Sequence, residues 1–172
     1  MHIHRYAEAE TFLKRGSEIA SKNDMHHHDL SLSVLEANLH HRMGDNQYVY
    51  DHIDELVTFI KNTKITIQDY IEDLKLLIET FCGMNEFDRA EAVALSLDSS
   101  ATIANDIHMK LEASKLYMIV YKNSGNTEKY HDACVRFAED TIEVENTEAT
   151  QHLLEMDTAI ALSIADTPIE LL

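Results

Sequence analysis

The chain has 172 residues, with 31 acidic and 14 basic side chains and a formal net charge of −17. A surface that binds nucleic acid needs clustered basic residues, so this excess of carboxylates argues against nucleic acid and against anionic membrane surfaces. Only one Pro and four Gly interrupt the chain, and residues that favour helix are frequent, a composition typical of a nearly all-helical protein.

The two cysteines, Cys82 and Cys134, lie in apolar helical stretches and are too few for a disulfide framework. No apolar run reaches the roughly 20 residues that a membrane helix needs, and the N-terminus has no basic segment followed by an apolar one. We therefore expect reduced thiols and a soluble, cytoplasmic protein that needs no cofactor.

Apolar residues at spacings of three and four predict eight helices separated by short breaks. In chain order the predicted helices cover residues 5–22, 28–43, 48–62, 66–83, 86–97, 102–123, 127–144 and 147–165. The breaks at 44–46, 83–85 and 124–126 each hold a glycine that can end a helix and an Asn or Asp that can cap the next one. "TIQD" at 66–69 and "NEFD" at 85–88 fit a polar N-cap with an acidic residue three positions on.

These turns recur at a nearly fixed spacing, because Gly44, Asn85 and Gly125 lie 41 and 40 residues apart. After each turn, an aromatic residue is followed three positions later by a small or apolar one, as in Phe87 and Ala90. Self-similarity at such a period is typical of a helical solenoid, in which each helix hairpin buries its apolar face against its neighbours. We therefore predict an all-α repeat protein.

The segments "FCGMNEFDRAEAVALSL" at 81–97 and "YKNSGNTEKYHDACVRFAE" at 121–139 resemble the turn and second helix of tetratricopeptide (TPR) repeats. The resemblance covers about residues 5–165 and implies a right-handed α-solenoid of antiparallel helix hairpins. The period here is near 40 residues instead of 34, and the small residue expected in each first helix is kept only at Ala37. These departures imply a divergent, longer-repeat member of the family.

The whole chain is then a single repeat domain. It would hold a half-hairpin at 5–22, hairpins at 28–62, 66–97 and 102–144, and a final helix at 147–165. Because solenoids normally end in polar capping elements, we expect this domain to be part of a longer chain.

A narrower resemblance concerns "LYMIVYKNSGNTEKYHDACVRFAED" at 116–140. This segment is similar to the last repeats of cytoplasmic sensory regions that precede GGDEF diguanylate cyclase domains in Gram-positive bacteria. The GGDEF signature does not occur in this sequence, so the resemblance implies the regulatory part of such a protein.

Eleven histidines raise the possibility of a metal site, especially in the clusters at 2–4, 26–28 and 40–41. Zinc needs three or four converging ligands, usually spaced three or four residues apart on a helix, and none of these clusters has such a pair of histidines. We therefore predict no metal site. The best remaining combination is His28 and Asp29 with His40 or His41.

Catalytic motifs are also missing from the sequence. His131 lies three residues before Cys134, but both are surrounded by core-like residues, and no Gly-rich phosphate loop, HExxH or GxSxG motif occurs. The carboxylates are scattered along helical faces, as solvated charges are. The sequence therefore predicts no enzymatic activity.

A TPR-like superhelix presents a concave surface lined mainly by the first helix of each hairpin, here 28–43, 66–83 and 102–123. Six apolar residues are expected in the core beside it: Leu32, Leu35, Leu39, Leu74, Leu77 and Phe81. Six polar neighbours are candidate ligand-binding residues: Asn38, His41, Lys75, Glu79, Lys115 and Lys122. Three lysines on one groove of an acidic molecule would suit a carboxylate or an acidic peptide. The alternative is that they are ordinary exposed lysines.

"LYMIVY" at 116–121 is expected in the core.

We therefore expect a non-catalytic module that binds a protein or peptide in its concave groove and regulates an attached output domain, with homodimer formation as one means of control. Three alternatives stay open. The first is a stand-alone TPR-type scaffold, and the second is a peptide-pheromone receptor, although the start of this chain has no helix-turn-helix motif. The third is a histidine-rich metal-binding protein.

Overall fold

The computed structural model describes residues 3–25, 28–62 and 70–165 of the chain. Within these residues the chain forms seven α-helices and no strand: α1 (Ile3–Lys22), α2 (Asp29–Met43), α3 (Asn46–Asn62), α4 (Ile71–Gly83), α5 (Phe87–Ala104), α6 (Ile107–Ser124) and α7 (Thr127–Ala165). The fold is therefore all-α, as the sequence predicts. No helix in the described part of the chain is both long and apolar enough to cross a membrane.

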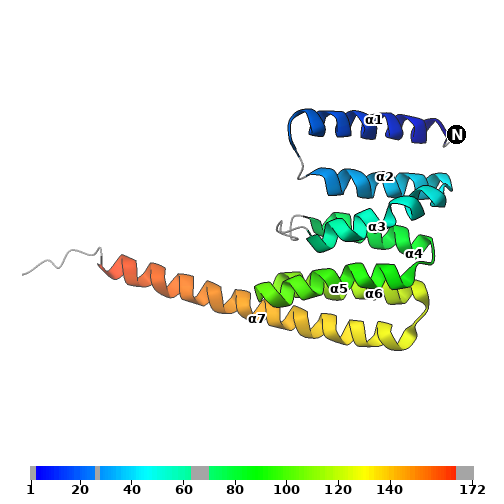
Figure 1. Cartoon of the computed structure of the whole chain (residues 1–172). Helices are drawn as coiled ribbons and strands as arrows, with labels where there is room; N and C mark the ends of the chain where they lie inside the picture. The colour runs from blue at the N-terminus through cyan, green and yellow to red at the C-terminus, as the bar shows by residue number, and fades with distance from the viewer. Residues whose placement is uncertain (1–2, 26–27, 63–69, 166–172) are drawn as a thin grey trace, which may run out of the picture.

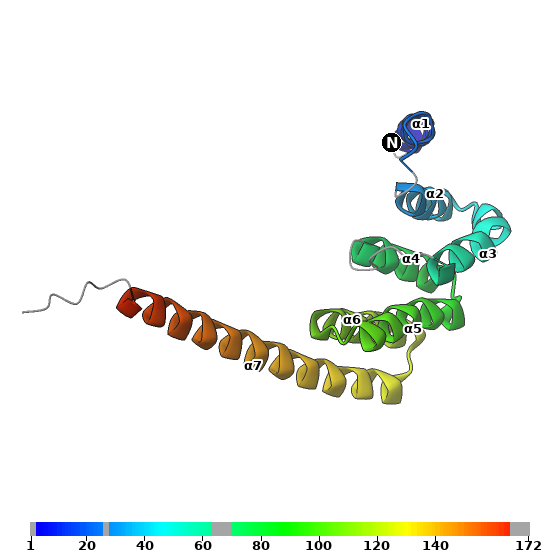
Figure 2. The same ribbon diagram turned by 60° about the vertical axis from the view of Figure 1, so that its left-hand side comes forward.

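The helices form an elongated stack in chain order, from α1 at one end to α6 and α7 at the other (Figure 1). Helix α2 packs against α1, α3 and α4, and helix α6 packs against α4, α5 and α7. Helix α7 has 39 residues whereas α6 has 18, so its second half projects well beyond the stack in both views (Figure 2).

The core runs along the stack and is richest in α4, α5 and α6. The largest apolar side chains with almost no exposed surface are Phe81, Leu74, Leu77, Ile78, Leu97 and Leu116. Ala37 is also fully buried, where α2 packs against its neighbours. Four of the six predicted core residues, among them Leu39, are buried, and Leu32 is half-buried. Leu35 is exposed, so that prediction is wrong, because this side chain lies on an uncovered face of α2.

The turns mostly follow the sequence signals. Gly44 and Gly125 have φ of 84° and 70°, the left-handed backbone that glycine adopts without steric cost. Asn126 caps α7 by accepting a hydrogen bond from the Lys129 amide at 3.1 Å. In the middle turn, however, Gly83 stays within α4 and Asn85 takes the left-handed conformation, with φ of 62°. The segment "NEFD" predicted that Asn85 is the N-cap of α5, and this prediction is wrong. The segment "TIQD" at 66–69 lies outside the described residues.

One predicted break is displaced. The sequence predicts helices at 86–97 and 102–123, but α5 continues to Ala104 and the turn falls at Asn105 and Asp106. Helix α5 continues through its serine-rich stretch because these hydroxyls bond to carbonyls one turn back within the helix. Asp106 then caps α6, because its carboxylate accepts from the Met109 amide at 3.0 Å.

A second predicted break does not exist. The sequence predicts separate helices at 127–144 and 147–165, whereas α7 runs unbroken through both. No Gly or Pro lies at 145–146, and the Thr147 hydroxyl donates to the Glu143 carbonyl within the helix at 2.9 Å. The described chain therefore has seven helices instead of about eight, and the final helix at 147–165 is the second half of α7.

Candidate binding groove

Three of the six candidate residues meet in one groove. Lys75 comes from α4, Lys115 and Lys122 come from α6, and the groove between these helices and α7 measures about 540 Å³. Lys75 and Lys115 lie 40 residues apart, which is the spacing of the repeat. Equivalent positions of successive repeats face the same surface, so the lysines come together where α4 contacts α6.

Two lysines of this groove pair with carboxylates of their own helices on the surface. The Lys75 ammonium lies 3.7 Å from Glu72, and the Lys115 ammonium lies 2.6 Å from Glu112. Within the described residues, Lys122 forms no ion pair. Solvent-exposed ion pairs of this kind contribute about 0–1 kcal/mol, so an incoming carboxylate can replace either glutamate. Three lysines and two glutamates leave a positive surplus here, although the whole chain carries −17.

The rest of the groove wall is mainly apolar. The remaining lining residues are Ile71, Leu116, Met118, Ile119, Tyr130 and Phe137. Of these, Tyr130 and Phe137 come from α7, so the groove is complete only when α7 is packed against α6. A cationic rim beside apolar side chains can hold a chain that carries both carboxylates and apolar groups.

Asn38 does not line this groove but connects α2 to α4. Its Nδ2 donates to the Thr80 hydroxyl at 2.9 Å, and its Oδ1 accepts from the Arg42 guanidinium at 2.9 Å. The Thr80 hydroxyl is fully buried and donates in turn to the Leu76 carbonyl at 2.8 Å. A buried hydroxyl needs such partners, so Asn38 supports packing between helices.

His41 and Glu79 also lie away from the groove lining. The His41 ring is half-buried, with Nδ1 2.8 Å from the side-chain oxygen of Asn46 and Nε2 against Gly83. Glu79 is exposed on α4. Burial, together with the charge of Glu79, raises the pKa of the Cys82 thiol to about 11, so this thiol stays protonated at neutral pH.

The contact between His41 and Gly83 gives a testable coupling. A Cβ added at Gly83 would clash with His41 Nε2. We expect Gly83→Ala to lower the free energy of unfolding by about 1 kcal/mol, because the imidazole must give up its bond to Asn46. In a His41→Ala background the same substitution should be neutral or stabilising, since Ala favours helix over Gly. Urea unfolding of the four proteins measures this, and equal effects in both backgrounds would contradict the contact.

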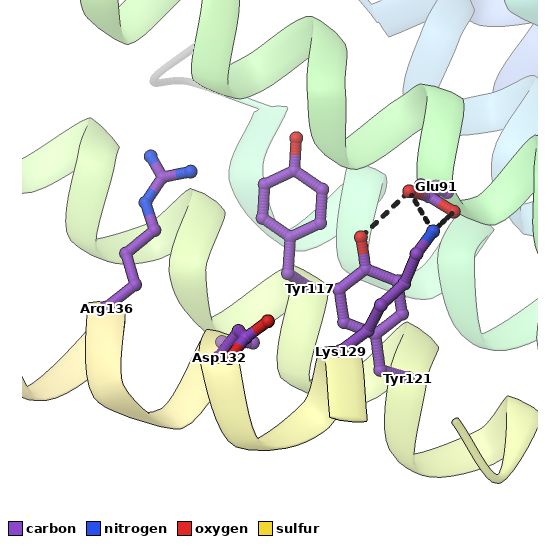
Figure 3. Close-up of a pocket in the computed structure, with 7 residues that line it drawn as sticks. Glu91, Tyr117, Tyr121, Lys129, Asp132 and Arg136 are labelled. Atoms are coloured by element: carbon purple, nitrogen blue, oxygen red, sulfur yellow. Dashed lines mark hydrogen bonds and ion pairs between the residues drawn. The ribbon is translucent and has the colours of Figure 1, made fainter. Parts of the chain in front are cut away.

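A second pocket, of about 260 Å³, lies between α5, α6 and α7 (Figure 3). Tyr117 and Tyr121 of α6 stack in it with ring centroids 5.8 Å apart. The Tyr121 hydroxyl donates to Glu91 of α5 at 2.8 Å, and the Lys129 ammonium of α7 donates to both Glu91 oxygens at 2.9 and 3.1 Å. The same ammonium lies 5.1 Å from the centroid of the Tyr121 ring.

Arg136 of α7 makes a similar connection further along the pocket. Its two terminal nitrogens donate to the two Asp98 oxygens of α5 at 2.9 and 2.5 Å, and its guanidinium lies 5.7 Å from the Tyr117 ring centroid. Arg136 Nε is also 3.7 Å from Asp140, which accepts a hydrogen bond from the buried Ser114 hydroxyl. Lys129 and Arg136 thus clamp α7 to α5 across α6, and we call the two ion pairs the α5–α7 clamp.

The pKa shifts agree with a structural role for this clamp. Burial raises the pKa of Tyr117 to about 12, and burial with the hydrogen bond to Glu91 raises the pKa of Tyr121. Burial alone would raise the pKa of Glu91, but the hydrogen bonds from Lys129 and Tyr121 outweigh it, and the pKa is lowered. The lowered pKa of Glu91 fits a carboxylate that is already paired with the Lys129 ammonium.

Leu116 and Val120 of "LYMIVY" are buried as predicted. The other four residues are half-buried: Tyr117, Ile119 and Tyr121 pack against the core, the two tyrosines also line the clamp pocket, and Met118 and Ile119 line the lysine groove. The sequence does contain a signal for the clamp. Asp98 and Arg136 carry opposite charges and lie 38 residues apart, a separation close to the repeat period.

The histidines that suggested a metal do not converge. Within the described residues, no group of three or more His, Cys, Asp or Glu side chains is placed to hold a metal ion, so His28 and Asp29 form no ligand set with His40 or His41. The His40 ring stacks on Tyr48 with centroids 3.7 Å apart, and its Nδ1 lies 3.0 Å from Asp45. Residues 26–27 and 1–2 lie outside the described ranges.

The chain was compared with protein-family models, curated proteins and solved structures. No protein-family model matches this chain, and neither the curated proteins nor the solved structures include a match to it.

Proposed function

We propose that this chain is a non-catalytic binding module that holds an acidic peptide, or an acidic segment of a protein, in the groove between α4, α6 and α7. The observation that supports this function is the meeting of Lys75, Lys115 and Lys122 beside an apolar wall in a chain of charge −17. The lysines would bind carboxylates, and the apolar wall would take the intervening side chains of the ligand.

The proposed architecture is a right-handed, TPR-like superhelix of the antiparallel hairpins α2–α3, α4–α5 and α6–α7. Two observations support it. Two or three residues connect the helices of each pair, which favours a reversal of direction. The first helices α2, α4 and α6 also contact one another in turn, as do α3 and α5. In this arrangement the lysines lie on the surface formed by first helices.

The electrostatics limit how such a ligand can bind. The chain as a whole repels anions, so long-range steering would slow the approach of an acidic peptide. Binding must then depend on short-range contacts with the lysines and the apolar wall. We therefore expect a modest affinity that weakens as salt is raised, because the lysines are exposed to solvent.

The direct test uses a fluorescein-labelled peptide of alternating Glu and Leu, with a Lys and Leu peptide as the charge control. Fluorescence polarisation with the full chain should show binding of the Glu peptide only. Reversing the groove charge should weaken this binding at least about tenfold, because three attractions become repulsions. The groove variant is Lys75→Glu, Lys115→Glu and Lys122→Glu.

A matched variant separates groove contacts from the change in net charge. It reverses three exposed basic residues of α1, far from the groove along the stack: Lys14→Glu, Arg15→Glu and Lys22→Glu. Both variants lower the net charge equally, so only the groove variant should lose binding. Equal loss in both variants, or no binding by the unmodified chain, would remove the support for this function.

We further propose that the module is cytoplasmic and regulates an attached signalling output, for which the resemblance of residues 116–140 implies a diguanylate cyclase. The free thiols Cys82 and Cys134 suit a reducing compartment. A stand-alone TPR-type scaffold is the alternative, since the groove requires no output domain. Reading the coding DNA beyond the codon for Leu172 distinguishes them: an in-frame GGDEF signature supports regulation, and a stop codon supports the scaffold.

A further inference from the structure

The lysine groove is elongated and follows α6. Its α6 members run from Glu112 to Lys122, a rise of about 15 Å along the helix axis. Helices α4 and α7 each pack against α6, and the stack places α6 between them (Figure 1). Both also supply lining residues, so α6 forms the floor of the groove and the other two helices form its walls.

Two kinds of side chain recur along this groove at the same interval. Lys115 and Lys122 lie seven residues apart on α6, and Tyr130 and Phe137 lie seven residues apart on α7. Seven residues make nearly two helical turns, so the members of each pair point the same way and are displaced by about 10.5 Å along their helix. The groove therefore repeats a cation on its floor and an aromatic ring on its wall at one common step.

The proposed antiparallel course of α6 and α7 sets each lysine level with one ring. Contacts between the two helices support this course, because their positions fall along α6 as they rise along α7: Tyr121 with Lys129, Tyr117 with Arg136, and Ser114 with Asp140. Lys122 and Tyr130 are each four residues from Asn126 in the turn. Lys115 and Phe137 are each eleven residues from it. The groove thus offers two equivalent lysine–ring sets, one after the other.

We propose that the acidic ligand of this groove is an amphipathic α-helix that lies along α6, an inference that rests on the proposed function. Carboxylates seven positions apart on a helix share one face and are displaced by about 10.5 Å, so they match Lys115 and Lys122. In an extended strand, residues on one face recur at about 6.6–6.8 Å instead. The next residue on that face, or the one after it, would miss the second lysine by about 3–4 Å.

The other groove side chains favour the helix as well. Lysine side chains bend and absorb a misfit of a few ångströms, but the short, stiff side chains of Tyr130 and Phe137 keep the spacing of their backbone. Ile119 lies four residues after Lys115 and three before Lys122. The α6 floor is thus cation, apolar, cation. Its complement is a helix with an anion, apolar residues three and four positions on, and a second anion at the seventh.

The experiment offers the full chain three fluorescein-labelled peptides of equal length. The helix peptide carries Glu at seven-residue intervals and Leu three and four residues after each Glu, with Ala and Gln elsewhere. The strand peptide has the same composition with Glu and Leu alternating, and the proline peptide replaces a central Ala of the helix peptide with Pro. Fluorescence polarisation should show the helix peptide binding at least about tenfold more tightly than either of the others, because Pro interrupts a helix and alternation removes the seven-residue match.

The pairing is tested by double-mutant cycles between Glu→Gln in the helix peptide and Lys115→Met or Lys122→Met in the chain. The Glu that couples to Lys115 should lie seven residues from the Glu that couples to Lys122. Lys110→Met is the matched control, because Lys110 lies on α6 outside the groove lining and should couple to neither Glu. Circular dichroism should show intact helix in all three variants.

The outcomes separate this inference from the proposed function. Equal affinity for the helix and strand peptides, or undiminished binding of the proline peptide, would overturn the helical ligand while the groove would still bind acidic segments. Coupling of the two lysines to carboxylates at any other spacing would overturn it too. Failure of all three peptides to bind would instead contradict the proposed function itself.

Discussion

Replacing Phe81 with Ala should lower the free energy of unfolding by about 3–5 kcal/mol, the usual cost of removing a buried aromatic side chain. Phe81 is the largest of the fully buried side chains and lies in α4, which packs against α2, α5 and α6. Because α4 is packed against three helices, we expect that the cavity left by Ala will not close without moving one of them. Urea unfolding followed by circular dichroism measures the change.

Phe12→Ala is the matched control for this substitution. Phe12 is 71% exposed on α1, so the same chemical change removes little buried surface. Its effect should stay within about 0.5 kcal/mol, as for other exposed positions. A loss for Phe12→Ala as large as that for Phe81→Ala would contradict the placement of the core in α4.

Replacing Arg136 with Met should lower the free energy of unfolding by about 1.5–3 kcal/mol, the range for hydrogen bonds to charged groups. Arg136 forms a bidentate ion pair with Asp98, whose side chain is largely buried, and it also lies near Asp140. Without the guanidinium, these two carboxylates lose their cation. We expect a value at the lower end of the range because the guanidinium itself is partly exposed.

Lys14→Met provides the comparison for the α5–α7 clamp. Lys14 pairs with Glu10 at 2.8 Å on the surface of α1, where both groups are exposed. Pairs of that kind contribute about 0.3–0.5 kcal/mol on a helix, so thermal or urea unfolding should hardly change. If Lys14→Met and Arg136→Met had equal effects, the clamp would be no more than another surface ion pair.

The clamp also links stability to the proposed binding site. Arg136 and Lys129 hold α7 against α5, and α7 supplies Tyr130 and Phe137 to the lysine groove. A loosened α7 would therefore open one side of the groove.

The amino-acid sequence by itself determined the features that depend on local or periodic signals. The near absence of Pro and Gly predicts helix throughout, and Gly44 and Gly125 mark turns because glycine tolerates the left-handed backbone. The repeat period also placed Lys75 and Lys115 on one surface, since equivalent positions of stacked repeats face the same way.

Some boundaries failed because local signals compete. Residues 145–146 were predicted as a break between two helices, yet threonine can bond to the carbonyl one turn back and let a helix continue, as Thr147 does. Asn85 looked like an N-cap, but Asn also tolerates the left-handed conformation that ends a helix, and this second property prevails there. Either outcome is compatible with the local sequence.

Only the tertiary structure decided which polar residues remain available to a ligand. The Asn38 side chain is hydrogen-bonded to Thr80, 42 residues away, and the His41 ring packs against Gly83. Lys122, in contrast, forms no ion pair among the described residues. Tyr121 packs against the core, while its hydroxyl bonds to Glu91 and its ring faces the Lys129 ammonium. Helical periodicity gives the face on which a side chain lies. Which partner satisfies that side chain depends on contacts between residues far apart in the chain, and these form only when the helices stack.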